Sequence, residues 1–406
     1  MKLHRNLALG IHTGLVRILN ENQALRPTLE RLLMQNRKWG SRDRKLLGEA
    51  ILEITRWKRK YTYLGNFDEN DPNFLWKLIG IWFIEKGNPL PDWKDFTTHH
   101  GIPVFIQNSI ETAHRKIKAS IPDWLDDLGV EVFEPPFWEN EINAQNQPAP
   151  LVLRCNTLKC TKDQLQKILQ EDHDIIAESI EEIPHALVLS SHQKITHLPS
   201  FKMGWFEVQD ANSQRVAEWL APTTGSFIVD ACAGAGGKTL HLASMMSNSG
   251  KIHAIDVHEE KLKELTRRAD RNGVTNISTH LAEDLHFFKK NAGKADGVLI
   301  DAPCSGLGTL RRNPAAKWHV TPEKLLDWQK LQQELLLKNA VLVKPNGVLI
   351  YATCSIFPQE NNQQIITFLK SNIGAAFVLE KEKTFYAHTS GFDGFYIARM
   401  VRNNEL

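Results

Sequence analysis

Apolar residues recur at helical spacing through much of the first 120 residues. The clearest stripe lies between residues 46 and 57, at Leu46, Leu47, Ala50, Ile51, Ile54 and Trp57. Such spacing places the apolar side chains on one face of an amphipathic helix. Ser41 is the expected N-cap of this helix, with Asp43 in its first turn. The pattern predicts an all-helical domain over residues 1–120.

The pattern changes near Pro122. Residues 134–150, EPPFWENEINAQNQPAP, are rich in Pro, Asn and Gln, which is typical of a loop or linker. Beyond them, LVLRCNT and HALVLS predict strands, and TKDQLQKILQ predicts a helix between the two. We therefore expect a linker and a small α+β domain over residues 121–207.

From residue 208 onward, short apolar runs alternate with helical stretches. The runs are FIVDAC, KIHAID, NISTHLAED, ADGVLIDAPC and GVLIYATC. Strands that alternate with helices at this spacing predict a parallel, doubly wound sheet. The last segment, from AAFVLE to GFYIARMV, predicts an antiparallel pair. Residues 208–406 are thus expected to form an α/β domain.

Composition narrows the class of protein. No apolar run approaches the ~18–20 residues that span a bilayer, and the N-terminus has no recognisable secretion signal. Five cysteines without regular spacing do not indicate a disulfide framework. We expect a cytoplasmic monomer that binds neither a membrane nor a metal.

The formal net charge of +2 conceals an uneven distribution. Residues 1–60 hold 14 Lys/Arg and 5 Asp/Glu, whereas residues 61–150 hold 6 and 14. A basic segment can contact phosphates without reading sequence, although a solvated helix face is the alternative. The candidates for RNA contact here are Arg42, Arg44 and Lys45.

A glycine-rich segment, DACAGAGGKT, lies between the first strand and first helix of the α/β domain. Glycines let a backbone approach a ligand closely, and open α/β sheets bind ligands at the carboxyl ends of their strands. Gly234 stands only three residues before Gly237, which excludes a phosphate-binding P-loop. The dinucleotide fingerprint GxGxxG is also absent.

Two aspartates favour a nucleoside cofactor without phosphates. Asp256 ends the second strand and could accept hydrogen bonds from ribose hydroxyls, while Asp284 follows the third and could contact an adenine amino group. Each alone could instead cap a helix. Together they point to S-adenosylmethionine.

Cysteines follow the next two strands. Cys304 lies in DAPCSG and Cys354 in ATCS, so adjacent strand ends would bring both thiols to the cofactor edge. A zinc site is the competing interpretation, but no further Cys or His stands nearby at ligand spacing. Cys155 and Cys160 are expected to be structural.

These motifs resemble the Sun-type RNA (cytosine-5) methyltransferase family. The resemblance is carried by DACAGAGGKT, AIDVHEEKL, DAPCSGLGTLRRNP, IYATCSIFPQEN and DGFYIARM. It implies a Rossmann-like class I methyltransferase domain. At the N-terminus, NRKWGSRDRKLLGEAILEITRW is similar to the NusB-like RNA-binding domain of the family's bacterial members. Within the family, the chain resembles the bacterial members that act on small-subunit ribosomal RNA, which implies a 16S ribosomal RNA substrate.

The resemblance also implies residue roles. Cys354 attacks C6 of cytosine, Cys304 assists release of the enzyme, Asp301 hydrogen-bonds the base at N3, and Lys238 approaches the base. Cofactor binding falls to the loop and the acidic strand ends: Cys232, Ala233, Gly234, Ala235, Gly236, Gly237, Lys238, Asp256, Asp284 and Asp301. Ala235 stands where family members often carry Pro, and we expect a looser turn there.

Arg311, Arg312 and Lys317 follow the PCSG motif and are further candidates for phosphate contact. The same reaction on transfer RNA is one alternative. A non-catalytic RNA-binding assembly factor is another, although both thiols argue against it. A dinucleotide oxidoreductase lacks its phosphate fingerprint here.

Overall fold

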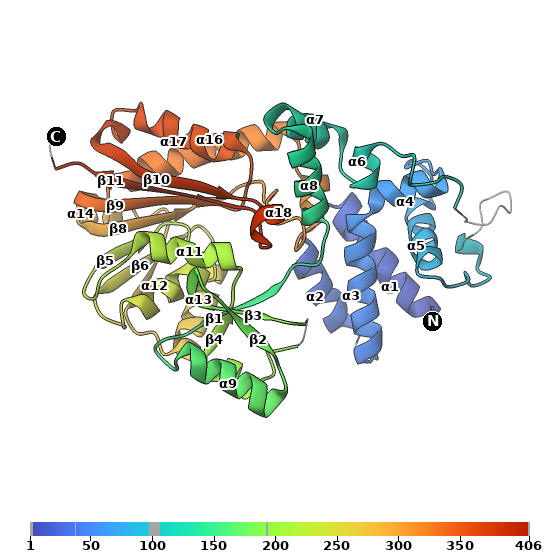
Figure 1. Ribbon diagram of the computed structural model, residues 1–406, viewed down its shortest axis with the longest axis horizontal. Coiled ribbons are helices and arrows are strands. Elements are labelled where there is room, and N and C mark those ends of the chain that lie inside the picture. Colours follow the sequence, from blue (N-terminus) through green and yellow to red (C-terminus); the bar gives the residue numbers. More distant parts are fainter. Residues whose placement is uncertain (1–2, 37, 97–105, 192–193, 405–406) are drawn as a thin grey trace. The chain divides into compact units, whose positions relative to one another are not determined.

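The chain divides into two compact units in a computed structural model, which describes residues 3–36, 38–96, 106–191 and 194–404 (Figure 1). The first, called here the helical unit, comprises residues 1–147 and 309–322. The second, called the sheet unit, comprises residues 148–308 and 323–406. Both units are therefore built from segments that are distant in sequence.

The helical unit confirms the helical prediction for the start of the chain. Its elements are α1 (Arg5–Leu15), the π-helical turn η1 (Val16–Asn20), α2 (Leu25–Gln35), α3 (Ser41–Arg56), α4 (Lys58–Gly65), α5 (Phe74–Glu85), the 3₁₀ turn η2 (Lys94–Phe96), α6 (Arg115–Lys118), α7 (Asp123–Val132), α8 (Pro135–Gln145) and α15 (Ala316–His319). The predicted stripe of α3 faces the core of this unit: Leu47, Ala50, Ile51 and Ile54 are fully buried. Gly40, not Ser41, is the N-cap, and Asp43 accepts a hydrogen bond from the Gly40 N–H.

The expected linker at 134–150 is wrong for most of its length, because residues 135–145 form α8. The two prolines stand in the first turn, where a missing N–H costs nothing. Trp138, Glu141, Ile142 and Gln145 are buried at positions i, i+3, i+4 and i+7. This helical stripe is present in the sequence, but two of its four members are polar.

Residues 309–322 contribute to the helical unit from within the α/β part of the sequence. Ala315 lies in the unit's hydrophobic core. The Trp318 Nε1–H donates to the Thr55 carbonyl over 2.6 Å, and His319 Nε2 lies 2.6 Å from the Ile18 carbonyl oxygen. The helical unit is therefore completed by a segment that lies far beyond α8 in the sequence.

The sheet unit contains the predicted small α+β fold. A four-stranded antiparallel sheet has the order β2-β3-β1-β4 and is packed against α9. The elements are β1 (Leu151–Cys155), α9 (Lys162–His173), β2 (Ala177–Ile180), β3 (Ile183–Leu189), α10 (Pro199–Lys202) and β4 (Phe206–Val208).

The larger sheet confirms the α/β prediction. Seven strands stand in the order β10-β11-β9-β8-β5-β6-β7, with parallel pairing from β9 to β7 and an antiparallel pair, β10 and β11, at one edge. The strands are β5 (Phe227–Asp230), β6 (Lys251–Asp256), β7 (Ile277–Leu281), β8 (Ala295–Asp301), β9 (Val343–Thr353), β10 (Phe377–Phe385) and β11 (Phe395–Arg402).

Helices cover both faces of this sheet (Figure 1). One face packs against α14, α16 and α17, and the other against α11, α12 and α13. These helices are α11 (Ala211–Leu220), α12 (Gly237–Met245), α13 (Glu259–Asn272), α14 (Leu285–Asn291), α16 (Pro322–Ala340) and α17 (Asn362–Leu369). Short turns η3 (Pro358–Glu360), η4 (Gly374–Ala376) and α18 (Ala387–Ser390) complete the unit. Within the described residues, no helix is both long and apolar enough to cross a membrane.

Candidate active site

The glycine-rich loop connects β5 to α12 at the carboxyl edge of the sheet. Gly234 and Gly236 have φ angles of +53° and +87°, in the left-handed region that favours glycine. A Cβ at Gly236 would lie 2.7 Å from Leu265, whereas a Cβ at Gly234 would meet nothing within 4 Å. Gly236 is thus needed for packing and backbone shape, while the backbone at Gly234 borders open space.

A cavity of about 270 Å³ lies beside this loop. Its lining contains seven of the predicted cofactor residues: Cys232, Ala233, Gly234, Ala235, Gly237, Lys238 and Asp301. Gln209, Ser213 and Asp230 also line it. None of these three is among the predicted site residues, although Gln209 and Ser213 fall in WFEVQDANSQ, the segment that leads into the α/β domain, and Asp230 begins the glycine-rich segment.

Two predicted acidic residues lie outside the cavity lining. Asp256 accepts hydrogen bonds from the backbone N–H groups of Gly234, over 2.8 Å, and His258, over 2.9 Å. Asp284 caps α14 by accepting from the Phe287 N–H over 3.0 Å, and this bond lowers the pKa of its carboxyl. Both aspartates therefore hold local backbone structure. For Asp284 this is a helix cap, which the sequence offered as the alternative to a contact with adenine.

Lys238 and Asp301 meet at the same edge. The Lys238 Nζ lies 2.6 Å from Asp301 Oδ2 and 5.2 Å from the centre of the Phe395 ring. Asp301 is the last residue of β8, and Lys238 stands in the first turn of α12. Two residues 63 positions apart in sequence thus form one ion pair.

The two predicted thiols come together beside the strand that carries Asp301. The Sγ atoms of Cys304 and Cys354 are 3.2 Å apart. Their loops follow the neighbouring strands β8 and β9, and the Ala302 N–H donates to the Ala352 carbonyl over 2.8 Å. The contact with Cys354 and burial both raise the pKa of the Cys304 thiol well above its usual range. The Cys304 thiol is therefore held in its protonated form.

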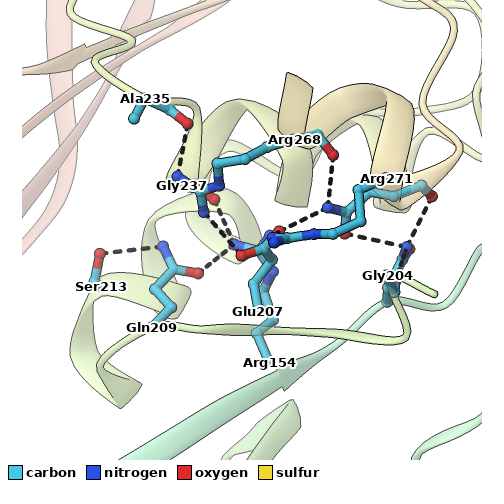
Figure 2. A network of polar contacts seen from close by, with 11 residues as sticks. Arg154, Gly204, Glu207, Gln209, Ser213, Ala235, Gly237, Arg268 and Arg271 are labelled. Atoms are coloured by element: carbon cyan, nitrogen blue, oxygen red, sulfur yellow. Dashed lines mark hydrogen bonds and ion pairs between the residues drawn. The ribbon is translucent and has the colours of Figure 1, made fainter. Parts of the chain in front are cut away.

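A buried polar network connects the small sheet to the glycine-rich loop (Figure 2). Arg154 of β1 donates to the carbonyl of Gly237, and Arg268 of α13 donates to the carbonyl of Ala235 over 2.6 Å. Glu207 of β4 pairs with both Arg268 and Arg271. Despite burial, these arginines hold the pKa of Glu207 below its usual value. No local pattern in the sequence predicts this network, because its members come from three separate elements.

The structure corrects the predicted RNA contacts at Arg44, Arg311 and Lys317. Arg44 donates to the backbone carbonyls of Leu33, Asn36 and Trp39, so its guanidinium ties the end of α2 to α3. Arg311 is only 5% exposed and donates to the Ala144 carbonyl. These guanidinium groups stabilise the fold by satisfying carbonyls that a helix end leaves without partners.

Lys317, the further candidate in that segment, is only 1% exposed. Burial lowers the pKa of its ammonium group well below the usual range. By contrast, Arg42 and Lys45 are exposed, and Arg312 is half-buried. Of the residues predicted to contact phosphate, Arg42 and Lys45 are the ones that lie on a surface.

Part of the charge asymmetry is neutralised inside the helical unit. Basic residues of the first sixty pair with acidic residues of the next ninety, as in Lys58–Glu69, Arg59–Asp123 and Lys60–Glu85. Lys86 and Glu53 pair in the opposite sense. The uneven sequence distribution therefore overstates the basic character of the folded surface.

The sheet order, the glycine-rich loop and the cavity at the carboxyl ends of the strands define a Rossmann-like methyltransferase fold. Among sequence families, the 16S rRNA methyltransferase RsmB/F model matches residues 217–401, and the RsmF/B-like ferredoxin-like domain model matches residues 121–196. The chain belongs to the RsmB/F methyltransferase family.

Curated relatives agree with this family. A probable ribosomal RNA small subunit methyltransferase B of Synechocystis is 38% identical over 62% of this chain and 57% of its own length. The ribosomal RNA small subunit methyltransferase B of Vibrio cholerae is 33% identical, over 72% of this chain and 68% of that protein. The chain thus spans little more than half the length of the Synechocystis relative.

Solved structures agree with the fold. The crystal structure of PH0851 is similar with a TM-score of 0.82 and 24% identity, covering 98% of this chain and 99% of that one. A methyltransferase homologue from Pyrococcus horikoshii has a TM-score of 0.64 and 27% identity, covering 73% of this chain and all of that one. The match to the ferredoxin-like model begins at residue 121, whereas compactness groups α7 and α8 with the helical unit.

Proposed function

We propose that this protein methylates C5 of a cytosine in 16S ribosomal RNA, with S-adenosylmethionine as the methyl donor. The observation that carries the proposal is the thiol pair, with Cys304 and Cys354 Sγ atoms 3.2 Å apart at the edge that also holds Lys238 and Asp301. Methylation at C5 requires a nucleophile at C6 and a second group for release, so two thiols at one site suit this reaction.

The residues beside the glycine-rich loop fit S-adenosylmethionine. The open space at Gly234 and Gly237 gives a ligand access to the backbone, since a Cβ at Gly237 would meet only Gln209 at 3.9 Å. Asp256, at the end of β6, has a second lone pair on each carboxylate oxygen for ribose hydroxyls. Among the described residues that line the cavity, Lys238 is the one basic side chain, and it already pairs with Asp301. When bound, the cofactor supplies an electrophilic methyl group.

The nucleophile is assigned to Cys354. Its thiolate adds to C6 of the cytosine and forms a carbon–sulfur bond, while a proton is taken up at N3, where Asp301 hydrogen-bonds the base. The addition makes C5 electron-rich enough to take the methyl group. The raised pKa of the Cys304 thiol supports this assignment, because the thiolate is the nucleophilic form of cysteine and Cys304 is held in its protonated form.

Release is assigned to Cys304. Once Cys354 is bonded to C6, the contact between the two thiols that raises the pKa of Cys304 is lost. Cys304 can then lose its proton to water and accept the proton from C5. The C5–H electron pair re-forms the C5–C6 double bond, the C6–S bond breaks, and the Cys354 thiolate is regenerated. The proton taken up at N3 during addition returns to solvent, which leaves neutral 5-methylcytosine.

The target base must leave its stack to reach thiols at a strand edge, so a single-stranded or loop site in the RNA is expected. Arg42 and Lys45 are proposed to contact RNA phosphates, since both are exposed. A cytoplasmic setting suits the reaction, because it keeps the two thiols reduced.

Substitution of each thiol tests the mechanism. Cys354→Ala should abolish methylation and leave no covalent complex, whereas Cys304→Ala should accumulate a denaturation-resistant protein–RNA adduct. Gel mobility after denaturation measures the adduct, and bisulfite mapping of ribosomal and transfer RNA from cells lacking the protein locates the target. Adduct in the first variant and none in the second would reverse the assignment. If every cytosine that is methylated in wild-type cells is still methylated in cells lacking the protein, the proposed reaction is rejected.

A further inference from the structure

Glu360 is a fully buried carboxylate beside the loop that carries Cys304. Its Oε1 accepts the Ser305 N–H over 2.8 Å, and its Oε2 accepts the Ser305 hydroxyl over 2.5 Å. Ser305 follows Cys304 directly in the chain. One carboxylate therefore holds the residue after the thiol through both backbone and side chain.

Gln332 of α16 holds the residue before the same thiol. Its Nε2 group donates to the Pro303 carbonyl over 2.9 Å and to Glu360 Oε1 over 3.1 Å. The Glu360–Gln332 pair thus fixes the backbone on both sides of Cys304. Both side chains are 0% exposed, so water does not compete for these bonds.

Asn361, the next residue after Glu360, makes the equivalent contacts around Cys354. Its Oδ1 accepts the Thr353 hydroxyl over 2.6 Å, and its Nδ2 donates to the Ser355 carbonyl over 3.1 Å. Thr353 and Ser355 are the two chain neighbours of Cys354. Glu360 ends η3, and Asn361 lies between η3 and α17. Glu360 together with Gln332 therefore contacts both chain neighbours of Cys304, and Asn361 contacts both chain neighbours of Cys354.

The turn itself is anchored to the sheet. The Tyr351 hydroxyl of β9 donates to the Glu360 carbonyl over 2.7 Å. Within the described part of the chain, the Glu360 carboxylate is satisfied by hydrogen bonds from Ser305 and Gln332 and not by an ion pair. Burial of such a carboxylate costs free energy unless its hydrogen bonds are made. Burying a glutamine at this position would cost less desolvation free energy than burying Glu360. Its NH2 group, however, would face one of the groups of Ser305 or Gln332 that donate hydrogen bonds to Glu360.

We propose that Glu360 and Asn361 are positioning residues that set the separation of the two thiols, Glu360 for Cys304 and Asn361 for Cys354. The assignment of each residue to one step of the reaction rests on the proposed function. The claim that these residues set the distance between the thiols does not, because that distance exists in the free protein. Loss of the Glu360 contacts should displace Cys304 and impair release, whereas loss of the Asn361 contacts should displace Cys354 and impair addition.

Thiol proximity can be tested without RNA. Phenylarsine oxide bridges two neighbouring thiols, forming two As–S bonds and releasing one water, with no change in oxidation state. The test uses the full chain with Cys155 and Cys160 changed to Ser, because that pair is also close, with its Sγ atoms 3.7 Å apart. Mass spectrometry measures bridging of Cys304 to Cys354. We expect Glu360→Gln and Asn361→Ala to weaken it at least tenfold.

Gln363→Ala is the matched control, since Gln363 is an exposed amide on α17, one turn from Glu360. It should bridge as the parent does, and Cys304→Ala should not bridge at all. Bridging of parental strength in both Glu360→Gln and Asn361→Ala would overturn the proposal. If thermal unfolding shows that Glu360→Gln does not fold, Ser305→Ala decides. It removes the hydroxyl's hydrogen bonds with Glu360 and with the Leu307 N–H but keeps the bond from the Ser305 N–H to Glu360. It should weaken bridging less, and parental bridging in that variant would reject the role of Glu360.

The covalent adduct with RNA then tests the division between steps. Glu360→Gln should accumulate adduct as Cys304→Ala does, and Asn361→Ala should form severalfold less than the parent. If both variants bridge more weakly but form as much adduct as the parent, the positioning role is retained. The assignment of Glu360 to release and of Asn361 to addition is then rejected. The two readouts thereby separate failure of the inference from failure of the proposed function.

Discussion

Asp230 is a carboxylate in the interior of the sheet unit, at the end of β5 and only 1% exposed. The Thr239 hydroxyl donates to its Oδ2 over 2.7 Å. Burial, with a further contribution from the nearby charge of Asp301, raises the pKa of Asp230 to about 7. This carboxyl therefore keeps its proton in the folded chain over a pH range in which an unfolded aspartate is ionised.

The Asp230→Asn variant should be stabilised relative to the parent as pH rises. The folded parent binds more protons than the unfolded chain between about pH 4 and pH 7, so its unfolding free energy falls over that range by up to about 1.4 kcal/mol per pH unit. Asparagine does not titrate. Melting temperatures at pH 5 and pH 8 check this, and a difference that does not grow with pH would contradict it.

At the residue scale, the sequence predicts which side chains could take part in the reaction better than it predicts what surrounds a given side chain in the fold. Cys304, Cys354 and Lys238 could be selected because motifs fix their places at strand ends or in the glycine-rich loop. Arg44 and Arg311 could not be assigned in the same way, because a charged side chain in the sequence does not reveal whether it faces solvent or a carbonyl. Their guanidinium groups bind backbone carbonyls within the helical unit.

At the scale of elements, the glycine-rich loop depends on two arginines that it does not contain. Arg268 holds the Ala235 carbonyl from α13, and Arg154 holds the Gly237 carbonyl from β1. The alanine at position 235 was expected to loosen the turn, and the Arg268 contact restrains its carbonyl from outside. The small sheet thus takes part in shaping the cofactor loop.

Arg268→Ala should weaken binding of S-adenosylmethionine about tenfold, because a loss of about 1.5 kcal/mol is typical when a charge-assisted hydrogen bond is removed. The KM for the cofactor should rise while kcat changes little, since the thiols are held by other contacts. Isothermal titration and initial rates measure the two effects.

Arg267, the chain neighbour of Arg268, provides a matched basic control. Its side chain is exposed and pairs with Glu264 on the surface of α13. Arg267→Ala should therefore bind cofactor as the parent does. Equal weakening by both substitutions, or a fall in kcat alone for Arg268→Ala, would be inconsistent with a role in shaping the loop.

The sequence predicted helices and strands correctly where apolar residues form short runs or recur at regular spacing. It failed where polar residues form part of a buried stripe. Central strands of the large sheet, such as β5 and β8, were found because each contains a short apolar run. Helix α8 was missed because Glu141 and Gln145, which are buried, are polar residues of a kind common in loops. Their burial depends on partners distant in sequence: Leu310, for example, donates its N–H to Gln145.

At the scale of the whole molecule, the helical unit is closed by residues 309–322. Arg56 shows the connection, because it donates to the carbonyls of both Asn146 and Arg311 over 2.9 Å. The sequence pattern predicts a continuous domain at the N-terminus, since periodicity carries no information on where a distant segment packs. The organisation into units therefore required the three-dimensional structure.

Trp318→Phe should destabilise the helical unit by about 1 kcal/mol, the typical value for one lost hydrogen bond, here from Nε1 to Thr55. Hydrogen exchange should quicken in α1, α3 and α5 and remain unchanged in β5, β6 and β8. Trp219→Phe, in the sheet unit, provides the reciprocal control. Protection that stays at the parental level in the helices would show that the segment contributes little to their stability.

The discontinuous helical unit has a consequence for synthesis on the ribosome. The chain emerges from its N-terminus, so helices α1 to α8 are complete well before residues 315–319 leave the exit tunnel. During that interval the core residues that later pack against Ala315 lack this contact, and the Thr55 carbonyl lacks its hydrogen bond from Trp318. The buried Arg56 also lacks the Arg311 carbonyl. The N-terminal part of the nascent chain therefore stays incompletely packed until most of the sheet unit's parallel strands have also been made.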